Sequence, residues 1–176
     1  MFRTSPIFVP GAQPQMRGFG RAGGGAALEF ITGVSGGSQR NDLGFPVGMK
    51  FTVGASDLML THIGRWIVSG NSGTHDVKLW DGAGSLQGSV NIDTSAGTPD
   101  TFSYLPIGPI TLSNGQDYFM MSYEDNGGDQ WLSADSSISV SGDATIIGAY
   151  FFEPPFSSEG ASGTACYVPV NFKYTL

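Results

Sequence analysis

The sequence predicts an all-β protein, an antiparallel β-sandwich preceded by an extended N-terminal arm. Glycine makes up 27 of the 176 residues, and charged residues are only 13% of the chain. This composition favours tight turns over solvated helices. From about residue 43 onward, short stretches rich in β-branched and aromatic residues alternate with turn dipeptides. Such spacing, about every ten residues, is typical of sandwiches and barrels.

Nine strands are expected in this second part of the chain, arranged in two packed sheets. Asp81-Gly82, Asn114-Gly115 and Asn126-Gly127 separate several of them, because glycine and asparagine accept the positive φ that tight connections need. Alternation in the third strand places Val77 and Leu79 on one face and Trp80 on the other. The expected strands cover residues 49–53, 58–68, 75–80, 86–92, 101–105, 118–123, 137–140, 145–152 and 168–174.

The organisation expected from the sequence is an arm over residues 1–28, a linker over 29–42 and a sandwich over 43–176. The arm is rich in Pro, Gly and Arg and lacks any strand or helix period, so it does not form a core of its own. It carries a charge of +3, whereas residues 29–176 carry −10. An acidic body repels nucleic acid and anionic membranes at long range, so neither is expected as a partner.

We expect the arm to act as an assembly element. Ordering it costs roughly 1–2 kcal/mol per residue, which it does not recover by folding on itself. It therefore needs a partner, which we expect to be another subunit, in a homo-oligomer or alongside other proteins of the same particle. Phenylalanines supply apolar anchors and arginines supply partners for carboxylates. The arm residues expected to make these contacts are Phe2, Arg3, Phe8, Arg17, Phe19 and Arg21.

The sequence shows no targeting or membrane segment. Pro6 and Pro10 interrupt the few large apolar residues near the start, so no signal-peptide apolar region is present there. No apolar run approaches the about 20 residues of a membrane span. The single Cys166 excludes an intrachain disulfide. We therefore expect a soluble protein made without its own export signal.

Several segments from residue 51 onward resemble a β-sandwich family of bacterial surface proteins, a domain of unknown function often appended to secreted or glycan-acting proteins. The most specific segment is the Gly-Thr-His-x-Val-x-Leu-Trp-Asp element at residues 73–81. The other segments that carry the resemblance lie at residues 51–53, 60–66, 69–72, 111–118 and 169–174.

The resemblance implies a jelly-roll-like sandwich used for attachment or recognition, with no catalytic residues. This chain differs from the family in its basic arm and in lacking an export signal. Those differences favour a bacteriophage virion protein, a structural or decoration subunit on the capsid or tail surface, by analogy with sandwiches attached through an N-terminal segment. The alternative is a carbohydrate-binding or host-attachment module that is secreted or displayed on the cell surface and binds a cell-surface glycan.

The densest acidic cluster lies at residues 124–129. Glu124, Asp125 and Asp129 lie among glycines, and carboxylate oxygens are the ligands that calcium prefers. A solvated hairpin loop that needs no cofactor is the alternative. Tyr123 and Trp131 flank the cluster, where they either stack on a sugar or anchor the loop to the core.

Other motifs do not predict an enzyme. Residues 18–23 match the dinucleotide fingerprint Gly-x-Gly-x-x-Gly, but they lack the preceding strand and the following helix that the motif requires. His75 and Asp76 point to opposite faces of a strand, so they form no simple catalytic dyad, and a structural His75 is expected. His62 and Cys166 lack the paired spacing of a zinc site.

Overall fold

The structure, a computed structural model, describes residues 25–162, 165–167 and 169–176. Within them it contains fourteen strands and no helix, and accordingly no helix long and apolar enough to cross a membrane. The predicted all-β fold is confirmed. The strands are β1 (Leu28–Glu29), β2 (Ile31–Ser35), β3 (Gln39–Arg40), β4 (Pro46–Val53), β5 (Leu58–Trp66), β6 (Thr74–Asp81), β7 (Leu86–Asp93), β8 (Phe102–Leu112), β9 (Asp117–Tyr123), β10 (Trp131–Leu132), β11 (Ser137–Val140), β12 (Ala144–Phe151), β13 (Ser157–Ser162) and β14 (Asn171–Thr175).

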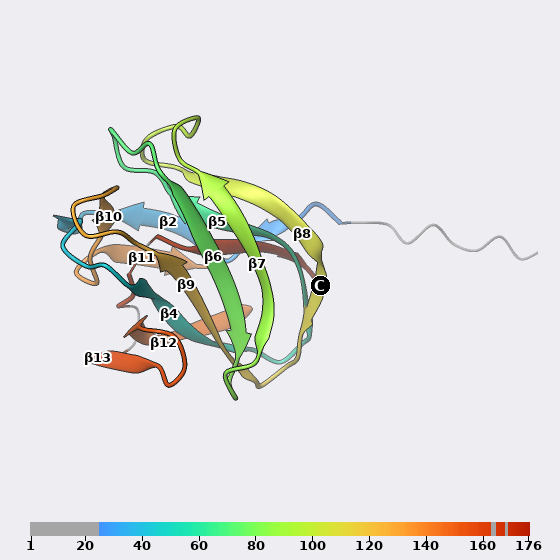
Figure 1. The fold of residues 1–176 in the computed structure, drawn as a ribbon. Coiled ribbons are helices and arrows are strands. Elements are labelled where there is room, and N and C mark those ends of the chain that lie inside the picture. The colour runs from blue at the N-terminus through green and yellow to red at the C-terminus, as the bar shows by residue number, and fades with distance from the viewer. Residues whose placement is uncertain (1–24, 163–164, 168) are drawn as a thin grey trace, which may run out of the picture.

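Two antiparallel sheets form the sandwich (Figure 1). The smaller has the order β1-β14-β5-β8 and the larger the order β13-β12-β4-β9-β6-β7, while β2 pairs with β11 and β3 with β10. The chain crosses between the two main sheets at β4–β5, β5–β6, β7–β8 and β8–β9, and β6 and β7 form a hairpin within one sheet. Repeated crossing between sheets is the connectivity of a jelly roll.

The main core lies between the two sheets. The larger sheet contributes Phe51, Val77 and Leu79, and the smaller contributes Leu60 and Phe172, all with no exposed surface. Val77 and Leu79 share the core face, as the alternation predicts. Burying a side chain of this size contributes about 1.5–3 kcal/mol, so this layer supplies most of the stability that positions the surface features.

A second apolar cluster covers part of the outer face of the larger sheet. It contains Trp80, Phe119 and Met121, against which Phe156 packs from the segment before β13. The Phe156 ring stacks on Phe119 with centroids 3.8 Å apart and meets Trp80 edge-on at 5.6 Å. Trp80 therefore faces outward from the main core, as expected, yet remains buried under this segment.

The expected linker over residues 29–42 is wrong. Leu28 and Glu29 pair with the last strand, and β2 pairs with β11. Phe30 and Ile31 are buried, at 0% and 1% exposure. The sequence did not indicate these strands because they are short, glycines follow the second of them, and their partners lie more than a hundred residues away.

Some strand boundaries also differ from those expected. Strand β8 continues to Leu112 through Pro106 and Pro109, which is tolerated because β8 forms an edge of its sheet and an edge strand has backbone groups outside the ladder. The last strand begins at Asn171, rather than at residue 168. The short strands β3 and β10, and β13 after the turn from β12, were not anticipated.

Candidate functional site

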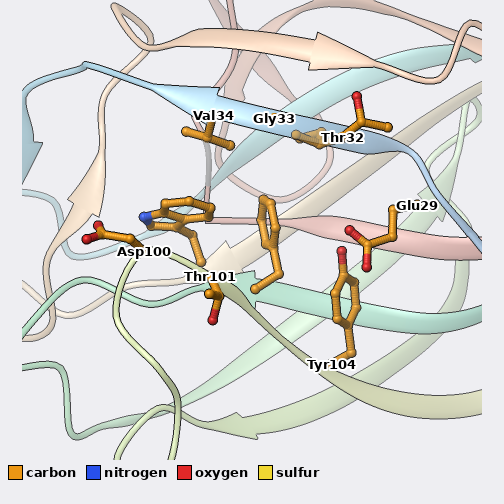
Figure 2. A pocket seen from close by; sticks show the side chains of 10 residues that line it. Glu29, Thr32, Gly33, Val34, Asp100, Thr101 and Tyr104 are labelled. Carbon is orange, nitrogen blue, oxygen red and sulfur yellow. The ribbon is translucent and has the colours of Figure 1, made fainter.

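A groove of about 310 Å³ lies between β2 and the outer face of β5 and β8. Figure 2 shows Thr32 and Val34 on β2 across from Tyr104, with Glu29 and Asp100 at opposite ends. A second hollow of about 270 Å³ shares Val34 and Asp100 with the groove and continues along β2. Together they form an extended depression, suited to a chain-like ligand more than to a compact one.

The groove exists because β2 separates from β14, and Asn171 holds the two strands at the point of separation. Its fully buried side chain accepts hydrogen bonds from the backbone N–H groups of Ile31 and Phe172, both at 2.8 Å. Its Nδ2 donates to the Ile31 carbonyl at 2.9 Å and to the Tyr104 hydroxyl at 2.7 Å. All four hydrogen-bonding positions of the amide are used. The side chain thus replaces the strand ladder where β2 turns toward β11.

Three aromatic side chains form a row along the groove. Trp66 meets Phe102 edge-on with centroids 5.0 Å apart, and Phe102 lies 5.9 Å from Tyr104. Gly64 pairs with Tyr104 across β5 and β8. A Cβ at Gly64 would lie 2.5 Å from the Tyr104 ring, so the glycine allows the ring to lie against the backbone of β5.

Two carboxylates line the groove. Glu29 pairs with Lys173 at 3.0 Å, and the Lys173 ammonium lies 4.2 Å from the centroid of Tyr104. Burial, together with the nearby Glu29 carboxylate, raises the pKa of the Tyr104 hydroxyl, so it stays protonated. Asp100 has a positive φ of 61°, and its carboxylate pairs with no cation within the described part of the chain.

A buried polar network lies at the acidic cluster that the sequence singled out. Arg65, with no exposed surface, donates two hydrogen bonds to Glu124, at 3.2 and 2.8 Å. His75 Nδ1 lies 2.8 Å from the Tyr123 carbonyl and its Nε2 lies 3.0 Å from Asp129. Because a carbonyl oxygen only accepts, Nδ1 carries a proton. His75 is thus hydrogen-bonded at the start of β6, as expected of a structural residue.

Asp129 fastens the loop after β9 to the loop before β6. It accepts hydrogen bonds from the backbone N–H groups of Ser72 and Gly73, at 2.8 and 2.9 Å, and from Thr94 Oγ1 at 2.6 Å. Burial raises the pKa of Asp129, but the hydrogen bonds from Thr94, Ser72 and His75 outweigh it and lower the pKa to about 2. The ionised carboxylate is therefore the state that the fold stabilises.

The three candidate calcium ligands have different surroundings. Glu124 and Asp129 are occupied by the network, whereas Asp125 is exposed. Among the residues that the structure describes, no group of three or more His, Cys, Asp or Glu side chains is placed to hold a metal ion. The arrangement accounts for both buried carboxylates through protein hydrogen bonds.

Of the two alternatives stated for Trp131, a ring that stacks on a sugar and a ring that anchors the loop to the core, the structure favours the second. Trp131 has no exposed surface; Tyr167 meets it edge-on at 5.0 Å and the Arg40 guanidinium lies 5.0 Å from its centroid. Strand β10, which carries Trp131, pairs with β3, so the ring anchors the loop to the core. Tyr123 is half-buried, and the Lys78 ammonium lies 4.3 Å from its ring centroid.

The arm residues expected to make assembly contacts, Phe2, Arg3, Phe8, Arg17, Phe19 and Arg21, lie outside the described residues. The aromatic groove was missed because its residues come from β2, β5 and β8, which are distant in sequence. One signal was available, since the alternation of Phe102 and Tyr104 with Ser103 places both rings on one face of a strand.

No family model and no curated protein matches the chain. The fold and the site define a class of protein, a jelly-roll-like β-sandwich with an aromatic groove on its outer face.

Proposed function

We propose that this chain is a non-enzymatic structural or decoration protein of a virion, on the capsid or tail surface. Its arm docks onto neighbouring subunits and its sandwich projects outward. One observation carries the proposal: each of the five basic side chains of residues 29–176 already pairs with a carboxylate of the same domain. The pairs are Arg40–Asp42, Lys50–Asp117, Arg65–Glu124, Lys78–Glu153 and Lys173–Glu29.

These pairs leave the body with a surplus of carboxylates, because residues 29–176 hold fifteen acids against five basic residues. The three remaining basic residues, Arg3, Arg17 and Arg21, all belong to the arm. Arginine forms strong, often bidentate hydrogen bonds with carboxylates. The arm of one copy is therefore the complementary partner for the acidic surface of another, and opposite charge steers the two together.

The buried polar network supports a role without catalysis. The two ring nitrogens of His75 face Tyr123 and Asp129, and the Glu124 carboxylate faces Arg65. A general base needs a lone pair within reach of a substrate proton. Here the acid–base groups are directed at one another, as expected for residues that fix loops.

Carbohydrate recognition by a host-attachment module is the second candidate function, and the aromatic row favours it. Phe102 and Tyr104, both half-buried, offer apolar surface beside the Glu29 and Asp100 carboxylates, and Trp66, which is 8% exposed, packs against Phe102 at one end of the row. Ring faces flanked by a few polar groups are typical of small-ligand sites. Calorimetric titration of the full chain with surface oligosaccharides tests it, because binding that Tyr104→Ala abolishes would establish this function.

The assembly proposal is tested with the full chain by reversing the charge of the arm. Arg3→Glu, Arg17→Glu and Arg21→Glu are combined, and a control carries lysine at the same positions. Sedimentation velocity should show self-association for the parent and the lysine control, weakening with salt because screening shortens the range of charge attraction. The glutamate variant should remain monomeric, and equal association of the two variants would contradict the proposal.

A further inference from the structure

We propose that the groove between β2 and β8 is the receptor for the arm of a second copy, and that residues 17–21, Arg-Gly-Phe-Gly-Arg, occupy it. Phe19 packs against the aromatic row, and Arg17 and Arg21 pair with the carboxylates at the two ends. This inference rests on the proposed function, in which the arm docks onto neighbouring subunits.

The chemical pattern of the groove matches this segment. The groove is aromatic in the middle and has Glu29 and Asp100 at its ends (Figure 2). Asp100 has no cation partner among the described residues. Glu29 bonds with Lys173 and Tyr104, and because a carboxylate has about four acceptor sites, it retains capacity for an arginine.

The spacing also agrees. In the strand register, Glu29 pairs with Lys173, and Lys173 pairs with His62 of β5. At the other end of the groove, the Asp100 N–H donates to the carbonyl of Ile67, which follows β5. Five residues of strand therefore separate the two carboxylate positions along the strand direction, about 16 Å, and the strands that carry them lie three strand spacings apart, about 14 Å, so the two positions are about 21 Å apart. An extended chain places the Cα atoms of residues 17 and 21 about 13 Å apart, and the flexible arginine side chains span the remainder.

The sequence of the arm selects this segment over its other aromatic positions. Phe19 has an arginine two residues away on each side, whereas Phe2 has one neighbouring arginine and Phe8 has none nearby. Glycines flank Phe19 directly. Without Cβ atoms at these two positions, the backbone can approach the walls of a narrow groove closely.

The strand register favours a neighbour's arm over the chain's own. Leu28 pairs with Tyr174, and Tyr174 pairs with Leu60 of β5. The chain preceding Leu28 therefore enters from the end of β5 opposite Trp66, and it runs away from the groove when followed toward the arm. Docking within one chain would require a reversal between residues 21 and 28, whereas docking between copies does not.

Disulfide trapping in the full chain tests the contact. Phe19→Cys is combined with Thr32→Cys, because Thr32 is exposed and lines the groove. The control combines Phe19→Cys with Ser89→Cys, at an exposed position on β7 of the other sheet. The native Cys166 is buried, at 1% exposure. Mild oxidation should cross-link copies of the Thr32 pair and not of the Ser89 control, and equal cross-linking of both would overturn the inference.

Mixing the single variants identifies the source of the arm. A Phe19→Cys copy and a Thr32→Cys copy should form a mixed disulfide dimer. If the double variant instead forms only an internal disulfide and the mixture forms none, docking is within one chain and the inference fails. A third outcome would also overturn the inference: the chain is monomeric, it binds an oligosaccharide, and no cross-link forms at the groove. The groove would then be assigned to a glycan.

A charge-neutralising pair separates this inference from the proposed function. Asp100→Asn suits the positive φ at this position because asparagine tolerates it, and Asp125→Asn removes an equivalent exposed charge elsewhere. Asp100→Asn should weaken self-association roughly tenfold, as loss of a charge-assisted bond implies, and Asp125→Asn should not. If Asp100→Asn and Asp125→Asn weaken association equally, while the arm with glutamate at positions 3, 17 and 21 still abolishes it, the groove assignment is overturned. The proposed function would then still stand.

Discussion

The Asp129 carboxylate predicts how the stability of the domain depends on pH. Its side chain is 8% exposed, and its pKa is lowered from 3.8 to about 2. A difference of this size corresponds to about 2 kcal/mol of folding free energy. Because the folded pKa is the lower one, this contribution is complete above pH 4 and is lost as the pH falls from about 4 to 2.

The test compares the parent with Asp129→Asn, which resembles the protonated acid. Urea unfolding at a series of pH values gives the free energy of unfolding of each protein. The difference between them should be about 2 kcal/mol larger at pH 7 than at pH 2, because this carboxylate's contribution vanishes only in the parent. If the difference in unfolding free energy between the two proteins does not change with pH, Asp129 is not the source of the pH dependence. Other carboxylates do not affect this comparison because they contribute equally to both proteins.

Four further predictions follow from single contacts. Asn171→Ala removes four hydrogen bonds of a buried side chain, including the acceptor of the Ile31 N–H, so chemical denaturation should show a loss of at least about 2 kcal/mol. Gly64→Ala should displace the Tyr104 ring and so weaken self-association, measured by sedimentation. Expressed as free energies, this loss of association should exceed the loss of stability that the melting temperature reports. Trp131→Ala should cost about 3–5 kcal/mol on unfolding; a near-neutral effect would contradict its burial. Chelation of calcium should leave the melting temperature unchanged, whereas a fall would indicate a bound ion.

The sequence was informative where structure is local. The turn at Asp81-Gly82 and the alternation of Val77 and Leu79 depend on neighbouring residues, and both predicted a strand at 75–80 and its core face, which the structure places at 74–81. Strands β1 and β2 depend instead on distant partners, since Leu28 pairs with Tyr174 and Val34 with Ile138. No local pattern carries that information, so residues 29–42 were mistaken for a linker.

The candidate sites divide in the same way. The acidic cluster was visible because Glu124 and Asp129 are close in sequence, but their role depends on Arg65 and Thr94, which only the fold brings to them. The sequence left open whether the ring of Trp131 is exposed or anchors the loop to the core, because its covering partner, Tyr167, lies 36 residues later. Proximity to a polar loop therefore did not imply exposure.

The central claim is that one copy's arm docks onto another copy, and complementation between two defective full-length variants tests it most directly. The first variant carries glutamate at Arg3, Arg17 and Arg21 and keeps its groove. The second keeps its arm and carries Asp100→Asn. Sedimentation velocity of the mixture should reveal a heterodimer at concentrations at which each variant alone is monomeric. A profile equal to the sum of the separate variants would contradict the claim.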